Sequence, residues 1–279
     1  MISLLNKYNN KKDFSLITGA AGLLGEQHAR ALLEIGQNVI LTDVDLKKLK
    51  MIETQLKKEF SNNIIFTKYM DVSKEHSIIA TWNYFKKKNF FINILINNAA
   101  IDPKFKKNEK TSNKSRFENF SVKQWEKELS VGLTGAILCS KIFGKALVKK
   151  KRPGVILNIA SDLSVISPNQ NIYKLNNKKI FDQPAKPVSY SVIKHGLVGL
   201  TKYLSTYWAE HHIRCNALSP GAVLNSQSQS LINKLKKLIP MARLANKNEY
   251  KSAVKFLCSD ESSYMTGQNI VIDGGRSVW

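Results

Sequence analysis

Tyr190 and Lys194 are four residues apart, a spacing that places both side chains on the same face of a helix. A phenol ionises near pH ~10, too high for a base at neutral pH. A neighbouring ammonium group favours the phenolate and lowers that pKa. The pair therefore predicts a general acid/base for an alcohol oxygen. Because Tyr-x-x-x-Lys also arises by chance on solvated helix faces, its weight depends on the residues upstream.

A glycine-rich turn, TGAAGLLG at residues 18–25, separates a predicted strand at 14–18 from a predicted helix at 25–35. This is the context of a dinucleotide-binding turn, where glycines let the backbone approach a pyrophosphate at the helix N-terminus. Tight strand-helix turns also use glycine for steric reasons alone. If the turn binds a cofactor, the predicted contacts are Gly19, Leu23, Leu24 and Gly25.

The turn and the Tyr-Lys pair occur in order with NNAA at 97–100, Ser161, and Pro220 followed by Gly221. With these landmarks the chain resembles the short-chain dehydrogenase/reductase family from about residue 14 to residue 275. The resemblance implies hydride transfer between a nicotinamide cofactor and an alcohol or ketone. It implies that Ser161 holds the substrate oxygen, Tyr190 transfers the proton, and Lys194 binds the nicotinamide ribose. Ser164 is the alternative serine, and Ser161 could instead cap a strand end.

A carboxylate, Asp43, follows the predicted strand at 39–42, where it can accept hydrogen bonds from ribose hydroxyls and repel a 2′-phosphate. No Arg lies in the following turn, although Lys47 and Lys48 are close, so NAD is expected over NADP. Asp43 could instead cap the next helix, a role also open to Asp45. The resemblance implies further cofactor contacts besides Tyr190 and Lys194: Asp71, Val72, Asn98, Ala99, Pro220, Gly221 and Val223.

One position departs from the family. In the helix after the fourth strand the family usually has Asn, which kinks the helix and whose carbonyl holds a water that relays protons to the Lys. This chain has Gly132 there, in SVGLTG. Gly keeps a carbonyl and tolerates a kink but lacks the side-chain anchor, so we expect a weakened relay. Gly132, and Leu23 where Gly is common, weakly support a rival hypothesis, a non-catalytic NAD-binding scaffold.

Strands and helices alternate along the chain, which predicts one Rossmann-type doubly wound α/β domain, 1–279, with a mostly parallel seven-stranded sheet. The predicted strands lie near 14–18, 39–42, 64–69, 92–96, 155–159, 214–218 and 270–272. The predicted helices lie near 25–35, 46–60, 74–87, 121–150, 188–211, 230–238 and 249–257.

Two segments, 102–119 and 168–187, interrupt this alternation. The second lengthens the interval between Ser161 and Tyr190 to 29 positions, longer than is usual in the family. Long loops in compact domains are commonly functional. We expect both insertions to flank the carboxyl edge of the sheet and to shape the substrate site.

The formal charge of +22 comes from 43 basic residues, of which only six are Arg. Specific phosphate and base recognition favours Arg, and no nucleic-acid-binding module is recognisable. Lys, Asn and Ile share A/T-rich codons, so genome composition is the simpler cause. We therefore expect no nucleic-acid partner, although a basic surface would attract anionic substrates.

No 18-residue apolar run is evident, so no membrane span is expected. The N-terminal residues lack the pattern of a signal peptide, which predicts a cytoplasmic protein. Cys139, Cys215 and Cys258 are widely spaced in apolar contexts. They are interpreted as buried thiols in a reducing compartment, not as a disulfide framework or a metal site.

Within the family, NAAIDP at 98–103, SDLS at 161–164 and DGGRSVW at 273–279 resemble bacterial flagellin-modification or surface-polysaccharide dehydrogenases. That resemblance implies a sugar phosphate or nucleotide sugar, whose phosphates Lys104, Lys106 and Lys107 could neutralise. The alternative is a reductase of 3-oxoacyl thioesters or small ketones. The family also implies a homodimer or homotetramer, with Trp279 suited to a subunit contact.

Overall fold

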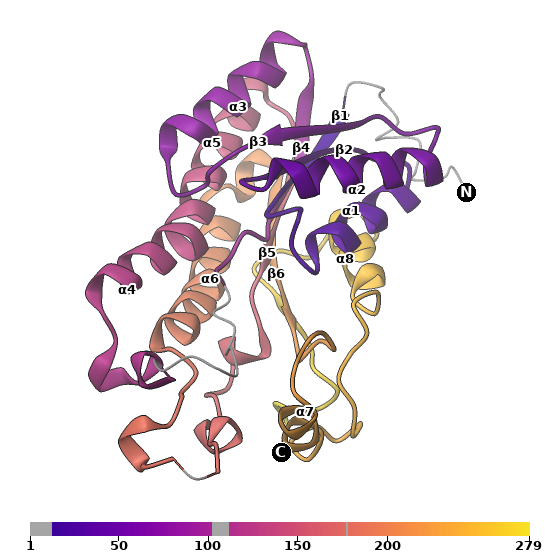
Figure 1. Ribbon diagram of the computed structural model, residues 1–279. Coiled ribbons are helices and arrows are strands. Elements are labelled where there is room, and N and C mark those ends of the chain that lie inside the picture. The colour runs from indigo at the N-terminus through magenta and orange to yellow at the C-terminus, as the bar shows by residue number, and fades with distance from the viewer. Residues whose placement is uncertain (1–12, 102–111, 177) are drawn as a thin grey trace.

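The computed structural model describes residues 13–101, 112–176 and 178–279. One parallel sheet runs through the molecule in the order β3-β2-β1-β4-β5-β6-β7 (Figure 1). Its order reverses between β1 and β4, the switch point at which doubly wound folds bind ligands. The strands are β1 (Asp13–Thr18), β2 (Asn38–Asp43), β3 (Ile65–Tyr69), β4 (Phe91–Asn97), β5 (Gly154–Ile159), β6 (Ile213–Pro220) and β7 (Asn269–Ile272).

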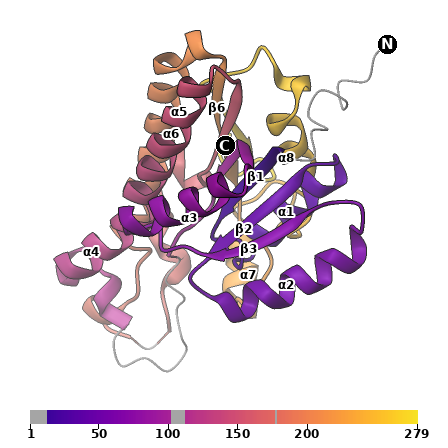
Figure 2. The same cartoon turned by 90° about the horizontal axis from the view of Figure 1, so that it is seen from above.

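Helices cover both faces of this sheet, as Figures 1 and 2 show. One face carries α3, α5 and α6, and the other carries α1, α2 and α8. The predicted doubly wound single domain is confirmed. The helices are α1 (Gly25–Glu34), α2 (Leu46–Glu59), α3 (Glu75–Lys87), α4 (Val122–Leu129), α5 (Gly135–Lys150), α6 (Val188–Tyr207), α7 (Gln229–Lys236) and α8 (Lys251–Cys258).

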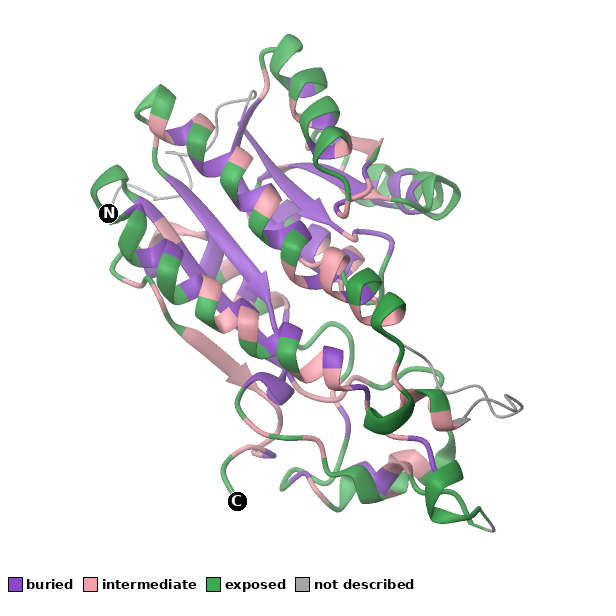
Figure 3. Ribbon diagram, turned by 90° about the vertical axis from the view of Figure 1, so that its left-hand side faces the viewer, coloured by how far each residue is buried: buried purple, intermediate pink, exposed green. Residues whose placement is uncertain are grey.

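The core is divided by the sheet into two apolar layers (Figure 3). Successive side chains of a strand point to opposite faces. In β1, Leu16 therefore packs on the α3 and α5 side, and Ile17 packs on the α1 and α8 side. Both faces of the central strands are covered, which explains why they read as continuous apolar runs. The buried thiols Cys139, Cys215 and Cys258 belong to these layers.

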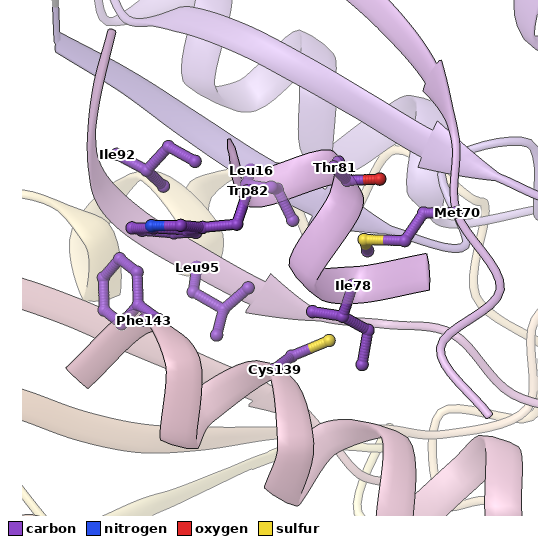
Figure 4. A pocket seen from close by; sticks show the side chains of 9 residues that line it. All are labelled: Leu16, Met70, Ile78, Thr81, Trp82, Ile92, Leu95, Cys139 and Phe143. Carbon is purple, nitrogen blue, oxygen red and sulfur yellow. The ribbon is translucent and has the colours of Figure 1, made fainter. Parts of the chain in front are cut away.

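A small cavity of about 10 Å³ lies between α3, α5 and the sheet (Figure 4). Its volume is about that needed for a single water, and its lining is almost wholly apolar. It is a packing gap between apolar side chains. The lining residues are Leu16, Met70, Ile78, Thr81, Trp82, Ile92, Leu95, Cys139 and Phe143.

The helical stretch Val122–Lys150 comprises α4, a π-turn at Ser130–Thr134 and α5. Within the described part of the chain it is the one helix long and apolar enough to cross a membrane by length and composition, contrary to the expectation that no such run exists. Of its most apolar window, 44% is buried inside the fold, and Lys141 and Lys145 lie on its exposed side. A core helix passes the same test, so no membrane span is indicated.

The two insertions differ in how much of them is described. Residues 102–111, with Lys104, Lys106 and Lys107, lie outside the described residues, and 112–119 form two short 3₁₀ turns. The insertion 168–187, apart from residue 177, contains 3₁₀ turns at Gln170–Tyr173 and Ile180–Asp182. The first of these packs against α7 below the sheet in Figure 1.

Candidate active site

The loop between β1 and α1 can be built only with glycine at two positions. Gly19 has a φ of +61°, and a Cβ added there would lie 2.7 Å from the Ala99 Cα. A Cβ at Gly25 would lie 2.4 Å from the Gly19 carbonyl oxygen. Positive φ and close backbone approach both exclude a side chain. The loop is therefore fixed by sterics at the switch point of the sheet.

The start of α1 satisfies the requirement for an anion site. Leu24 is its N-cap, and no described side chain caps the first backbone N–H groups. Uncapped N–H groups at a helix N-terminus attract phosphate. Leu23 is 39% exposed and Leu24 is half-buried, so both border the same loop surface. The loop fits a dinucleotide pyrophosphate.

Asn98 and Thr18 lock this loop to β4. The Asn98 side-chain amide donates to the carbonyls of Thr18 (3.1 Å) and Gly19 (2.9 Å). The Thr18 hydroxyl accepts from the backbone N–H groups of Asn98 and Ala99, each at 3.0 Å. Both amide hydrogens of Asn98 are thus used within the protein. Thr18 was not among the predicted site residues, although it opens the TGAAGLLG motif.

Asp43 lies at the carboxyl end of β2, beside the glycine-rich loop. Its Oδ2 accepts from the Ala21 N–H (3.0 Å) and its Oδ1 from the Asp45 N–H (3.0 Å). The helix cap of α2 is Asp45, whose carboxylate accepts from the Lys48 N–H. Asp43 is therefore not the helix cap. Its carboxylate lies next to the predicted position of the adenosine ribose.

Two further predicted cofactor residues, Asp71 and Val72, follow β3. The Asp71 carboxylate accepts from the Ser73 N–H (3.0 Å) and hydroxyl (2.6 Å), which fixes the turn. Val72 is buried against α5, where a Cβ on Gly135 would lie 2.9 Å from its Cγ2. They border the switch point from the β3 side.

On the opposite side, Gly221 follows Pro220 at the end of β6. The Gly221 N–H donates to the Ile272 carbonyl (2.9 Å), and a Cβ at Gly221 would lie 2.6 Å from the Asp273 Cα. Val223 forms a bridge to Ala245. Thus the turn after β6 rests directly on the C-terminal segment.

Ser161, Tyr190 and Lys194 meet where β5 ends against α6. Lys194 is buried, and its Nζ donates to the carbonyl of Ile159, the last residue of β5 (2.8 Å). The same Nζ lies 5.6 Å from the centre of the Tyr190 ring. Ser161 is buried two residues beyond Ile159, and its 3₁₀ turn packs against α6. The structure therefore brings the predicted trio to one edge of the sheet.

The alternative serine, Ser164, is used elsewhere. Its hydroxyl is 2.9 Å from that of Ser219 in β6 and accepts from Asn269 in β7. The Ser161 hydroxyl instead donates to the Asp162 carboxylate (2.8 Å). Ser164 thus belongs to a buried link between strands.

Comparison with known proteins agrees with this geometry. Residues 19–277 match the family described as enoyl-(acyl carrier protein) reductase. The 3-oxoacyl-(acyl-carrier-protein) reductase FabG of Buchnera aphidicola is 30% identical over 269 residues, 95% of this chain and 97% of that protein. The NAD-dependent glycerol dehydrogenase of Listeria innocua is 27% identical over 276 residues, 97% and 96% of the two chains. A short-chain dehydrogenase from Leptospira borgpetersenii with bound NAD⁺ superimposes with a TM-score of 0.79 at 28% identity, over 96% and 93% of the chains.

The chain belongs to the short-chain dehydrogenase/reductase family. It is an oxidoreductase of that type, acting on alcohols or ketones. The seven-stranded parallel sheet and the nucleotide-binding loop are those of the family.

In this short-chain dehydrogenase/reductase the expected kink is a π-turn, Ser130–Thr134, with Gly132 at its centre. A Cβ at Gly132 would lie 2.8 Å from the Ile193 Cγ2. Ile193 directly precedes Lys194 on α6, so it occupies the space beside the backbone that a side chain at 132 would need. An Asn cannot be restored there without moving Ile193.

Two residues near Tyr190 were missed in the sequence of this dehydrogenase/reductase. Lys186 places its Nζ 3.7 Å from the Tyr190 ring centre, and its backbone is held by the Gln170 side chain. Glu128 is buried and accepts from the hydroxyl of Ser189, the residue before Tyr190. Lys186 stands in the predicted insertion, which was its only sequence signal. Glu128 had no sequence signal, because Ser189, which donates to it, lies on another helix.

Proposed function

We propose that the protein is an NAD-dependent dehydrogenase that oxidises a secondary hydroxyl of a phosphorylated or nucleotide-linked sugar. The observation that supports the proposal is the contact of Lys194 with Ile159, two residues before Ser161, while the same Nζ lies 5.6 Å from the centre of the Tyr190 ring.

The cofactor supplies a hydride acceptor at its nicotinamide. Tyr190 would take the proton of the substrate hydroxyl as a general base, with the Lys194 Nζ 5.6 Å from the centre of its ring. The Ser161 hydroxyl orients the same oxygen. Gly19, Leu23, Leu24 and Gly25 would hold the pyrophosphate at the N-terminus of α1.

The preference for NAD rests on Asp43. Its carboxylate sits beside the loop and would repel a 2′-phosphate, and no Arg occurs between Val44 and Lys48 to attract one. The glycerol dehydrogenase relative is named as NAD-dependent, and the Leptospira structure holds NAD⁺. Asp71, Val72 and Val223 would border the rest of the cofactor.

A negatively charged sugar is supported by the surroundings of Tyr190. Lys186 puts a second cation over the tyrosine ring, where it could meet a phosphate or carboxylate of the substrate. A relative acting on glycerol supports a polyhydroxylated substrate. The likeness of SDLS and DGGRSVW to surface-polysaccharide dehydrogenases supports the same class. We further propose a cytoplasmic homodimer or homotetramer.

A 3-oxoacyl thioester is the second candidate, favoured by the FabG relative. The insertion that carries Lys186 argues for the sugar, because it adds polar and charged groups beside Tyr190.

The test is reduced-cofactor formation with a panel of sugar phosphates and nucleotide sugars, using NAD and NADP in parallel. Tyr190→Phe should bind NADH normally and lose roughly 10²–10⁴-fold in kcat, the range for one general acid/base. Retained turnover in Tyr190→Phe would refute the assignment. Turnover only with 3-oxoacyl thioesters would favour the second candidate. Cofactor binding without turnover on any alcohol or ketone would favour the non-catalytic scaffold.

A further inference from the structure

A buried ion pair stands next to Ser161. Arg276 donates from Nη1 to the Asp162 Oδ2 at 2.7 Å, and the two side chains are 7% and 5% exposed. Asp162 is the neighbour of Ser161 in sequence, and Arg276 comes from the C-terminal segment, 114 positions away. Buried charges are costly unless they are paired and hydrogen-bonded. The reason for burying this pair is therefore sought in the groups that Asp162 and Arg276 contact.

Asp162 is also the hydrogen-bond acceptor of Ser161. The Ser161 hydroxyl donates to Asp162 Oδ1 at 2.8 Å. An ionised carboxylate can only accept, so the single hydroxyl hydrogen of Ser161 points to Asp162. The Leu163 N–H donates to both Ser161 Oγ (3.2 Å) and Asp162 Oδ1 (2.8 Å), which closes a compact group. The position of the serine oxygen is thus defined by Asp162.

The segment that delivers Arg276 is itself rigidly turned. The Asp273 carboxylate accepts from the N–H groups of Gly275 (2.9 Å) and Ser277 (2.8 Å). Gly274 and Gly275 have φ of +69° and +88°, which lets the chain reverse tightly. The guanidinium is therefore aimed by this turn, which also supports Gly221.

We infer that Arg276 is a positioning residue for catalysis: it fixes Asp162, and Asp162 fixes the oxygen of Ser161. When substrate binds, the hydroxyl hydrogen turns from Asp162 to the substrate oxygen, while the Leu163 N–H keeps Oγ in place. Arg276 is buried, and its link to Ser161 runs through the Asp162 carboxylate. The inference rests on the proposed role of Ser161.

Removing the guanidinium leaves a carboxylate that is buried without its counter-ion. That carboxylate is no longer held in place by Arg276, and Ser161 then loses the fixed acceptor that orients it. A displacement on the order of 1 Å in a reacting group can lower the rate by about 10²-fold. We expect Arg276→Met to lower kcat by about 10- to 100-fold, with the Kd for NADH unchanged. Arg276→Lys, which keeps a cation, should recover part of the loss.

The decisive measurement is a double-mutant cycle of Ser161→Ala with Arg276→Met, in the full chain, with the folded fraction checked at the assay temperature. If Arg276 acts through Ser161, adding Arg276→Met to Ser161→Ala lowers kcat by no more than about twofold. Arg243→Met, which breaks the more exposed pair with Glu249, is the matched control and should leave kcat unchanged.

Additive losses in the cycle, or a folded Arg276→Met with normal kcat, would overturn the inference and leave the proposed function standing. A normal kcat in Ser161→Ala would instead remove the serine's proposed role, and this inference with it. Should Arg276→Met fail to fold, Asp162→Asn carries the same cycle. In Asp162→Asn, Arg276 donates to the single amide oxygen at position 162. The Ser161 hydroxyl then faces the NH₂ group, which cannot accept its hydrogen.

Discussion

His28 in α1 is a fully buried histidine beneath the glycine-rich loop, and neither ring nitrogen has a hydrogen-bond partner among the described residues. Burial lowers its pKa from 6.5 to about 4. The nearby Asn98 side chain acts in the opposite direction and raises this pKa, but burial is the larger effect. His28 is therefore neutral in the folded protein at physiological pH.

This pKa makes stability depend on pH. Below pH 6.5 the unfolded chain binds a proton at His28 that the folded protein does not accept until about pH 4. The free energy of unfolding should therefore fall as pH drops through this window, by about 3 kcal/mol from this group. Denaturant unfolding at pH 7 and pH ~4.5 measures the fall.

Other groups titrate in the same range, so the comparison is between variants. His28→Leu should show a smaller fall than the wild type. His76→Leu, on the exposed surface of α3, is the matched control and should keep the wild-type fall. Equal falls in all three proteins would contradict a buried neutral His28.

At the scale of elements, two helix glycines that look alike in sequence have opposite surroundings. A Cβ at Gly144 of α5 would lie 2.2 Å from the ring of Trp208, which follows α6. At Gly199 of α6, no described atom lies within 4 Å of such a Cβ. Gly144 therefore permits close contact between α5 and the end of α6, and Gly199 has no packing role.

Alanine substitution should separate the two. Gly144→Ala should destabilise by about 1–3 kcal/mol, because the buried indole must move. Gly199→Ala should stabilise by about 0.5–1 kcal/mol through helix propensity alone. Thermal and denaturant unfolding of both variants measure the difference, and a stabilised Gly144→Ala would show that Trp208 repacks without cost.

The elements themselves were largely predictable. Each strand is a short apolar run, whereas in each helix the apolar residues recur every three or four positions. All seven strands lie close to their expected positions. The seven expected helices appear as eight, because the helix expected at 121–150 is divided into α4 and α5. The kink at Gly132 followed from the family resemblance. Its contact with Ile193 did not, because that contact joins two helices. For the same reason the sequence did not predict the pairing of Asp162 with Arg276. Nor did it predict that Lys186 and Glu128 lie near Tyr190.

At the scale of the whole molecule, the dominant quantity is the formal charge of +22. Ion pairs near the surface, such as that of Lys251 with Glu34, contribute little stability. Like charges repel one another in the compact state, and this repulsion is screened by salt. The excess of lysine thus costs stability at low ionic strength.

We expect the melting temperature to rise as the ionic strength is raised from about 0.01 M to about 0.15 M. NaCl and KCl series should give the same rise if screening is the cause. A fall in melting temperature in both salts would mean that local ion pairs outweigh the global repulsion.

The reactivity of the three buried thiols can report local unfolding of the protein. Burial raises the pKa of Cys139, Cys215 and Cys258 to about 12 each, so almost no thiolate exists in the folded protein at neutral pH. Cys139 lies in α5, Cys215 in β6 and Cys258 in α8, so the two helical layers and the sheet between them each carry one. An alkylating reagent can modify Cys139 or Cys258 only when its helical layer separates from the sheet, and Cys215 only when the layer of α3, α5 and α6 no longer covers it. The order in which the three sites react would therefore trace which layer detaches first.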